Sequence, residues 1–458
     1  MKHRKLFAVL FVGLFLALCL IPSVGMFFNA DTSAAGNEHL SAVPLFKTED
    51  SRLNSSFPQE LTNYISDRFF LRHKLISANT KLLSKCFNVT GNAEVTLGVD
   101  DWLFYTETLD DAMGTNILSD RQLWCAAHTL SLMNEYCEDH DAAFLFTVAP
   151  NKASLYPEHL PKRLPISEKT NAKAFVSALK EQRIPYADLY SAFNSQDDIL
   201  YYRTDSHWND RGAALAADTV LKALNKAYTP FFSDNYSMTG LHKGDLYEMV
   251  YPAGSYEEKN AVFNRDFGFE YVGPFRSVED ITIHTSNTDA FGSLLLFRDS
   301  FGNSMYPYIA DSFANTCISR AMPYIMPALD RENADTVVIE LVERNIEWLC
   351  LRAPVMEAPE RNVKLPDVEN ISGVQANCIP CGELDGYCVI SGNLPVSPDT
   401  DSSVYFAADG TVFEASPAGE GQDPFTLYIP VERIPHQCAI AFYSEGTLEA
   451  YTVELITQ

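Results

Sequence analysis

The chain has 458 residues, of which 47% are hydrophobic and 12% aromatic, which is enough to fill sizeable folded cores and excludes a disordered chain. The formal net charge is −26. Nucleic acids and anionic membrane faces are polyanions and would repel such a chain, so the composition argues against both as binding partners. We interpret the acidity as that of a soluble surface.

The first segment is basic and then uncharged. Residues 2–5 (KHRK) precede an uncharged run at 6–28, which at about 1.5 Å per residue can cross a bilayer core of about 30 Å. The pattern predicts a transmembrane signal anchor at 1–28, in a single-pass cell-membrane protein whose globular part is extracytoplasmic. Cleavage near 29–31 is the alternative. The polar residues 29–58 predict a stalk.

Residues 59–353 have the pattern of an α/β domain with a mainly parallel sheet. Apolar residues at helical spacing between 61 and 82 predict one or two amphipathic helices packed against that domain. Further along, short apolar runs alternate with helical patterns. The expected strands are 142–148, 184–190, 294–297 and 336–341, and the expected helices are 171–182 and 211–227, the second capped by Asn209 or Asp210.

Residues 228–292 interrupt the domain with many Tyr, Phe and Gly residues and with short alternating runs such as 267–272. This pattern predicts a hairpin or a substrate-facing insertion. Aromatic side chains exposed there could stack on sugar rings, or they could form a small satellite core.

From residue 354 to 458, Pro, Gly and Asp punctuate short alternating segments, which is typical of a small β-rich, sandwich-like domain. Cys378 and Cys381 lie in this part with CxxC spacing. A second CxxC and a βαβ context are absent, so the pattern favours a disulfide, or a buried thiol cluster with Cys388 and Cys438, over a zinc pair.

An acid and a base lie two positions apart in the segment 204–212 (TDSHWNDRG). In extended backbone Asp205 and His207 point to the same side, whereas Ser206 points away. Asp205 would then orient one ring nitrogen of His207 and favour the imidazolium. The other nitrogen would be free to take a proton from a nucleophile.

A candidate nucleophile follows the apolar run 294–297. Ser300 lies where a buried strand is expected to turn into a helix, and Gly302 would allow an unusual backbone there. Backbone N–H groups of Gly302 and Asn303 could face a developing oxyanion at the start of that helix. The alternative is that Ser300 only caps the helix.

Further polar residues are expected at the carboxyl ends of strands, where open α/β sheets bind ligands. Asn151 and Lys152 could steady an oxyanion or a sugar hydroxyl, although Pro-Asn is also a common turn. Glu343 and Arg344 are interpreted as a structural ion pair.

Asp205 and His207 could also be metal ligands. No HxH, HExxH or Cys-paired histidine accompanies them, so we expect neither a metal nor a cofactor.

Six short motifs in chain order resemble those of the DHHW family, relatives of the alginate O-acetyltransferases with an SGNH-hydrolase-like fold. The central motif is Asp205-Ser206-His207-Trp208. The others are residues 98–105 (GVDDWLFY), 148–152 (VAPNK), 244–246 (GDL), 298–302 (RDSFG) and 340–345 (ELVERN).

The resemblance implies a three-layer SGNH-hydrolase-like domain and a Ser-His-Asp triad in which Asp205 and His207 precede Ser300. Ser206 departs from the family pattern, which has a histidine there. Tyr306 falls where related acetyltransferases have a tyrosine near the acyl group, and its alternative is an aromatic residue on a core helix face. Related proteins carry a carbohydrate-binding module at the carboxyl end. The C-terminal domain here could bind glycan, act as a spacer or contact another protein.

The function predicted from these features is O-acetylation of a cell-surface or secreted polysaccharide by a membrane-anchored enzyme. Because acetyl-CoA is cytoplasmic, the resemblance implies a membrane-bound O-acyltransferase as acyl donor. One alternative is a carbohydrate esterase with the same triad, in which water replaces the sugar. Another is a non-catalytic glycan-binding or assembly protein.

Overall fold

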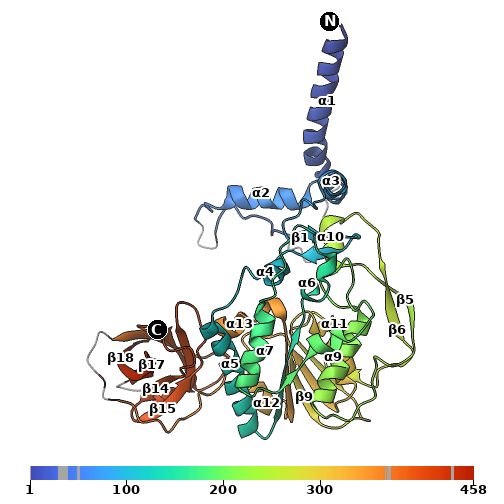
Figure 1. Cartoon of the computed structure of the whole chain (residues 1–458). Helices are drawn as coiled ribbons and strands as arrows, with labels where there is room; N and C mark the ends of the chain where they lie inside the picture. The colour runs from blue at the N-terminus through green and yellow to red at the C-terminus, as the bar shows by residue number, and fades with distance from the viewer. Residues whose placement is uncertain are drawn as a thin grey trace.

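The computed structural model of the chain has three visible parts (Figure 1): a projecting N-terminal helix, a central α/β body and a β-rich part that holds the C-terminus. It describes residues 2–28, 40–48, 52–366, 368, 373–434 and 438–457. Much of the predicted stalk, at 29–39 and 49–51, lies outside the described residues.

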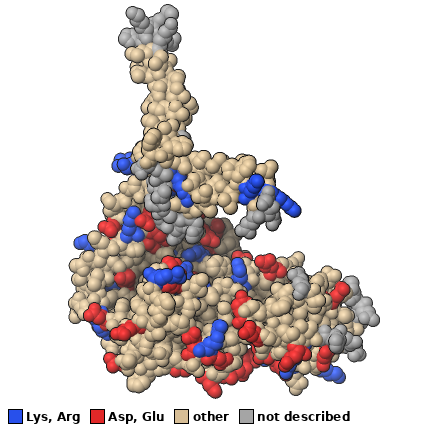
Figure 2. Space-filling view, turned by 180° about the vertical axis from the view of Figure 1, so that it is seen from behind, with Lys and Arg blue, Asp and Glu red and all other residues tan. Residues whose placement is uncertain are grey.

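The projecting helix is α1 (Lys2–Gly25), and most of its large apolar side chains are exposed. Figure 2 shows its shaft without charged side chains, whereas Asp and Glu are spread over the body. Within the described part of the chain, no helix combines the length and the apolar character that crossing a membrane requires.

Of the one or two helices predicted between 61 and 82, the structure has two, α2 (Phe57–Arg68) and α3 (Arg72–Phe87). The expectation that they pack against the body is wrong for α2, which has no buried residue, and Thr80 is the one buried residue of α3. Two contacts of α3 with the body are polar: the Ala253 N–H donates to Ser77 Oγ at 3.0 Å, and Ser84 Oγ lies 3.4 Å from the Tyr251 hydroxyl. Apolar spacing produced the helices, but no core covers their faces.

The body is built on one seven-stranded sheet in the order β4-β3-β11-β9-β10-β8-β7. β4, β3, β11, β9 and β10 pair in parallel, and β8 and β7 add an antiparallel edge. The mainly parallel sheet predicted from the apolar runs is therefore confirmed. The strands are β3 (Ala143–Ala149), β4 (Tyr186–Ala187), β7 (Glu270–Tyr271), β8 (Thr282–Ser286), β9 (Ser293–Phe297), β10 (Asn315–Ser319) and β11 (Thr336–Val342).

Helices cover both faces of this sheet, because its strands are apolar on both sides. Phe144 and Phe146 of β3 face one core, and Leu145 between them faces the other. The first core is closed by α5 (Asp120–Asp139) and α7 (Asn171–Glu181), the second by α9 (Asp210–Ala223) and α11 (Gly302–Ala310). Figure 1 shows the resulting three layers.

Two predicted boundaries differ. The strand expected at 184–190 is only the two-residue β4, because the Asp188 carboxylate accepts from the Ser191 N–H and starts α8 (Leu189–Asn194). α9 ends before residue 227, since Asn225 has a φ of 52°, which a helix does not continue. The cap of α9 is Asn209, whose side chain accepts from the Gly212 N–H at 3.0 Å.

The insertion 228–292 contains two antiparallel strand pairs, and the predicted run 267–272 supplies β7 of one of them, which pairs with β8. β5 (Tyr236–His242) pairs antiparallel with β6 (Glu258–Phe263), and α10 (Asp245–Val250) lies between them. Part of the aromatic set forms a core: Phe231 packs against Phe263, Phe267 and Tyr308.

The remaining elements of the body are short. They are β1 (Val95–Leu97), β2 (Leu103–Tyr105), α4 (Thr108–Met113), α6 (Lys152–Leu155), α12 (Ala328–Arg331), α13 (Trp348–Leu351) and the 3-10 turns η1 (Pro157–His159) and η2 (Glu343–Asn345).

The C-terminal part is a single seven-stranded sheet, so the predicted sandwich of two sheets is wrong. Its order is β15-β14-β17-β18-β12-β13-β16, and a bridge between Ser416 and Thr426 brings the outer strands together into a near-barrel. Curling one sheet buries the same alternating faces that two sheets would. The strands are β12 (Val374–Pro380), β13 (Tyr387–Asn393), β14 (Val404–Ala408), β15 (Thr411–Ala415), β16 (Pro424–Pro430), β17 (Cys438–Ser444) and β18 (Thr447–Thr457), with the turn η3 (Val431–Arg433).

The CxxC residues lie at the end of β12 and form no disulfide with each other. Cys378, Cys388 and Cys438 are buried in the core of the near-barrel, whereas Cys381 is half-buried outside it. Burial, together with the neighbouring Cys378 thiol, raises the pKa of Cys388 to about 12. Of the alternatives predicted for the CxxC pair, the buried thiol cluster agrees with the positions of Cys378, Cys388 and Cys438, and Cys381 is not part of it.

Candidate functional site

Ser300 lies in a tight turn between β9 and α11, at the carboxyl edge of the sheet, and is half-buried. Asp299 fixes the turn, because its carboxylate accepts from the Phe301 N–H at 2.9 Å and from the Val342 N–H of β11 at 2.7 Å. The neighbouring strand thus holds the serine at the strand-to-helix turn that the sequence predicted.

Three side chains predicted to act together form one hydrogen-bonded chain. The Ser300 hydroxyl lies 2.9 Å from Nε2 of His207, and Nδ1 of the same ring lies 2.8 Å from Asp205 Oδ1. Asp205 is buried, whereas the His207 side chain is 24% exposed. The imidazole therefore bridges the acid and the alcohol and is still reached by solvent.

Neighbouring aromatic rings fix the position of the imidazole. The Phe301 ring lies 4.8 Å from the His207 ring. Trp208 packs edge-on against Phe301, and its indole N–H donates to Ser304 of α11 at 2.8 Å. Residues flanking His207 and Ser300 thus dock the two segments together.

The backbone around Asp205 bends, so the predicted extended geometry is wrong, and so is the prediction that Ser206 points away. Ser206 Oγ donates to Asp245 Oδ2 at 2.5 Å and lies 3.1 Å from His207 Nδ1. A two-residue spacing brings Asp205 and His207 together here because the Asp205 carboxylate also accepts from the His207 N–H at 2.8 Å.

His242 and Asp245 join the site from the insertion, and neither was predicted as a site residue. His242 Nε2 lies 2.7 Å from Asp205 Oδ2, and the Asp245 N–H donates to the same oxygen at 2.9 Å. The motif 244–246 was the available signal: a Cβ on Gly244 would lie 2.2 Å from the Thr204 carbonyl oxygen, so this position requires glycine. No sequence feature singles out His242.

The charges of this cluster are strongly coupled. Burial by itself favours neutral Asp205, but hydrogen bonds from His207 and His242 hold its pKa well below the usual range. Burial opposes the charged form of His207, yet the carboxylates of Asp205 and Asp245 raise its pKa above 6.5. Burial and the nearby charge of Asp205 raise the pKa of Asp245. The site therefore favours an anionic Asp205 beside a readily protonated His207.

Lys152 lies behind this site, not in it. The side chain is buried, and its ammonium donates to the backbone carbonyls of Tyr202, Arg203 and Asp205. Burial lowers its pKa to about 8. Its observed role is to hold the 202–205 loop, which differs from the expected contact with an oxyanion or sugar hydroxyl.

Asn151 is also buried and engaged within the protein. Its side-chain amide donates to Asp111 Oδ2 at 2.9 Å, and its backbone N–H donates to Glu343 Oε2 at 2.7 Å. The turn interpretation, not the substrate contact, describes this geometry.

Gly302 is required for space and not for an unusual φ, contrary to expectation. A Cβ there would lie 2.5 Å from Cβ of Arg298. The Asn303 N–H donates to the Ser300 carbonyl at 3.2 Å, and its side chain bonds Arg298 and Glu279. Asn303 is thus committed to the turn itself, which leaves the Gly302 N–H as the remaining predicted oxyanion donor.

Tyr306 lies in the core of the body. It is fully buried, and its hydroxyl lies 2.8 Å from that of Tyr271. Its position on α11 agrees with the alternative interpretation, an aromatic residue on a helix face that packs in the core.

Glu343 and Arg344 do not form the predicted ion pair. Buried Glu343 accepts from Ser154 Oγ at 2.9 Å as well as from Asn151, and burial raises its pKa to about 7. Half-buried Arg344 lies over the rings of Tyr105 and Phe301, at 5.5 and 5.8 Å, and its charge partly offsets the rise in the pKa of His207. Arg344 thus brings a cation to the edge of the candidate site.

Asp205, His207 and Asp245 could also hold a cation, since one ligand atom from each lies within 4.8 Å of the others. These atoms already have partners in the histidine and serine hydrogen bonds. A metal would compete with the link between His207 and Asp205, so the donor set fits proton transfer better.

Part of the chain matches a known protein family. Residues 95–261 match a family described as an SGNH hydrolase-like domain, acetyltransferase AlgX. A probable alginate O-acetylase AlgJ from Pseudomonas fluorescens is 26% identical over 251 residues, which cover 52% of this chain and 59% of that protein. Its counterpart from Pseudomonas syringae pv. tomato is 26% identical over 252 residues, with the same coverage. The chain therefore spans about three fifths of the length of these relatives.

Two solved structures overlap more loosely with the chain. A DHHW family protein from Eubacterium siraeum is 16% identical and has a TM-score of 0.39, covering 48% of this chain and 85% of that one. The O-acetyltransferase domain of Pseudomonas putida AlgJ is 18% identical, also with a TM-score of 0.39, covering 55% and 92%. The family resemblance predicted from the motifs is confirmed by the family match and the relatives.

Proposed function

We propose that this chain, whose residues 95–261 match the SGNH hydrolase-like acetyltransferase family, is a serine-dependent O-acetyltransferase that acts on polysaccharide hydroxyls. Ser300 is the nucleophile, His207 the general base and acid, and Asp205 the residue that orients and charges His207. The observation that carries the proposal is the continuous hydrogen-bonded chain from Asp205 through His207 to Ser300 at a partly exposed serine.

The first half-reaction loads the enzyme. Ser300 Oγ attacks the carbonyl carbon of the acyl donor as its proton moves to His207 Nε2. The donor C–O bond then breaks, and His207 returns the proton to the leaving group, which leaves an acetyl ester on Ser300. Asp205 holds Nδ1 and stabilises the imidazolium that forms transiently.

The second half-reaction transfers the acetyl group. A sugar hydroxyl gives its proton to His207 and attacks the acetyl ester, and Ser300 Oγ regains a proton as it leaves. During both steps the oxyanion needs a donor, and the N–H of Gly302 at the start of α11 is the remaining predicted candidate. No residue in these steps requires a metal or a nucleotide.

The acceptor class and the cellular setting are part of the proposal. Both curated relatives are described as probable alginate O-acetylases, which supports a polysaccharide acceptor. Basic residues at 2–5, followed by a helix with exposed apolar side chains, support an N-terminal membrane anchor with the body outside the cytoplasm. A membrane-bound O-acyltransferase would then supply the acetyl group.

The test uses the purified full-length chain with an activated acetyl ester and a panel of acidic and neutral polysaccharides. We expect acetyl esters on a glycan, measured by NMR, and a fall of roughly 10³-fold or more in rate for Ser300→Ala. Ser177→Ala, at an exposed position on α7, is the matched control. Free acetate without acetylated glycan would indicate an esterase. Unchanged rates in Ser300→Ala would reject the triad, and inert wild-type protein would favour a binding role.

A further inference from the structure

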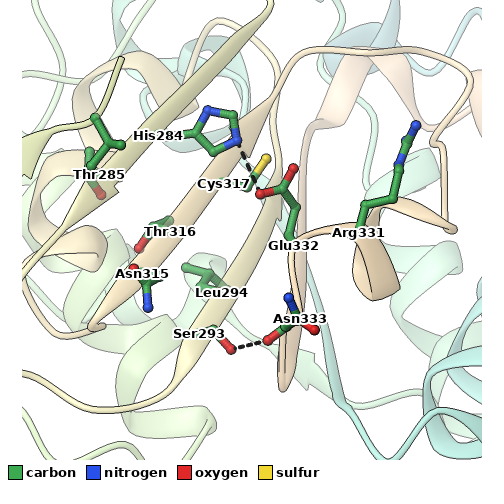
Figure 3. A pocket seen from close by; sticks show the side chains of 11 residues that line it. His284, Thr285, Ser293, Leu294, Asn315, Thr316, Cys317, Arg331, Glu332 and Asn333 are labelled. Atoms are coloured by element: carbon green, nitrogen blue, oxygen red, sulfur yellow. Dashed lines mark hydrogen bonds and ion pairs between the residues drawn. The ribbon is translucent and has the colours of Figure 1, made fainter.

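A second cluster of chemically reactive side chains lies on the same sheet, with His284 and Cys317 at the middle of β8 and β10. It borders a pocket of about 430 Å³ near the amino ends of β9 and β10, where Ser293 and Asn315 begin those strands. Figure 3 shows His284, Cys317 and Glu332 turned toward one another there. None of the three takes part in the proposed acetyl transfer.

Sheet register places two of these residues side by side. His284 of β8 pairs directly with Cys317 of the antiparallel strand β10, so both side chains lie on the same face. Glu332 follows α12 and reaches the same place, with Oε2 at 3.2 Å from His284 Nε2. The sulfur, a ring nitrogen and a carboxylate oxygen all lie within 4.8 Å of one another.

These three donors form a set typical of zinc. Thiolate, imidazole and carboxylate bind Zn²⁺ at about 2.3, 2.0 and 2.1 Å, which places tetrahedral N and O ligands roughly 3.3 Å apart. The observed 3.2 Å fits that geometry without movement of His284 or Glu332. Mg²⁺ and Ca²⁺ prefer oxygen ligands only, so the cysteine argues for a softer cation.

We propose that His284, Cys317 and Glu332 bind one Zn²⁺ ion, with the fourth coordination position open to the adjoining pocket. The ion would tie β8, which lies near the end of the long insertion, to the loop between α12 and β11. Cys317 lies on β10, which pairs in parallel with β9, whereas His284 lies on the antiparallel strand β8. The ion would therefore also link the antiparallel edge to the parallel part of the sheet. Its expected effect is on stability and not on the chemistry at Ser300.

Arrangements without a metal are the alternative: a surface ion pair between His284 and Glu332 beside a buried thiol. The body contains such a pair in His140 and Asp330, whose atoms lie 3.4 Å apart. His140→Gln is therefore a matched control for losing a partly exposed histidine–carboxylate contact.

The experiment uses the full-length chain, stripped with a chelator, desalted and titrated with Zn²⁺ or Co²⁺ alone. We expect one ion per chain, a rise in Tm on binding and a thiolate-to-Co²⁺ charge-transfer band. Cys317→Ser should abolish that band and weaken binding at least tenfold. Glu332→Gln should also weaken binding. Because Glu332 is partly exposed, this variant should fold even if the buried substitution Cys317→Ser prevents folding. His140→Gln should bind as wild type does.

The outcomes separate this site from the other candidates. The group around His207 has no sulfur ligand, so a metal bound there gives no thiolate band. Loss of the band in Cys378→Ser but not in Cys317→Ser would move the site to the near-barrel and overturn the proposal. Absence of stoichiometric binding by wild-type protein would overturn it as well. Ser300→Ala should bind zinc normally, which makes the test independent of acetyl transfer.

Discussion

The carboxylate of Asp205 accepts four hydrogen bonds, two on each oxygen. Oδ1 receives the ring and backbone N–H groups of His207, and Oδ2 receives His242 and the backbone N–H of Asp245. A buried carboxylate needs such partners to stay ionised, because burial alone favours its neutral form. The charge on Asp205 in turn raises the pKa of His207.

This coupling predicts a pH dependence for the wild type. His207 must be neutral to take the Ser300 proton, so activity should fall as pH drops through the raised pKa of His207. In Asp205→Asn the carboxylate is lost and that pKa falls. The acidic limb of the kcat/KM profile should therefore move to lower pH, while the maximal rate falls roughly 10³- to 10⁴-fold. An acidic limb that stays in place would show that Asp205 does not set the protonation of His207.

His242 is predicted to position Asp205 and not to touch substrate. His242→Gln keeps a hydrogen-bond donor near Asp205 Oδ2 but removes a group that can carry a positive charge. Burial opposes that charge, yet the Asp205 carboxylate raises the pKa of His242 overall. We expect a kcat reduced roughly 10-fold with KM nearly unchanged, and a shifted acidic limb. A change in KM alone would instead place His242 in contact with the substrate.

At the scale of elements, the 202–205 loop is held from two sides. The Lys152 ammonium binds three of its carbonyl oxygens from behind, and Glu258 of β6 accepts from the N–H groups of Arg203 and Thr204 at 2.9 and 2.8 Å. The hairpin thus helps to fix the loop that carries Asp205.

Lys152→Met should loosen this loop. It removes charged hydrogen bonds worth about 1.5–3 kcal/mol each in general, partly offset by the loss of a buried charge, so we expect about 1–3 kcal/mol lower unfolding free energy. Activity should fall by more than the unfolded fraction explains. Urea unfolding and kcat of the folded enzyme measure the two effects. Lys162→Met, at an exposed position, should change neither; equal loss in both variants would contradict the loop role.

At the scale of the whole molecule, the near-barrel is tied to the body by a partly buried charge cluster around Glu414. Glu414 of β15 lies 2.8 Å from His128 of α5 and 2.6 Å from Arg361, and Arg361 also pairs with Glu135 of α5. Burial would raise the pKa of Glu414, but His128 and Arg361 hold it at about 2.

This cluster predicts acid sensitivity of the interface. Because the pKa of Glu414 is lowered on folding, its contribution to stability is present above its ordinary value of about 4.5 and is lost as pH falls toward about 2. Arg361→Ala leaves Glu414 with His128 as its remaining charged partner and should cost about 1.5–3 kcal/mol. Calorimetry of this variant should then show two transitions, whereas we expect wild type to show one. A single unshifted transition would mean that the cluster does not couple the two parts.

Several features were determined by the sequence itself. Apolar runs of strand length predicted β3, β9 and β11 because buried parallel strands must be apolar on both faces. The Asp-Ser-His-Trp motif and the strand–turn–serine pattern predicted Asp205, His207 and Ser300, which the structure brings together over a separation of 93 positions between His207 and Ser300. Local patterns were sufficient there, because Ser300 directly follows β9 and His207 shortly precedes α9, and the residues next to each of them predict those elements.

Only the tertiary structure decided which polar residues face the site. Lys152 and Asn151 turned out to be buried supports, whereas His242 and Asp245 reach Asp205 from a hairpin whose docking no local pattern encodes. The pairing of His284 with Cys317 depends on the register of β8 against β10, and the closing of the near-barrel depends on the curl of one sheet. Side-chain direction, strand register and sheet curvature arise from long-range packing, and the sequence pattern of an isolated segment does not contain them.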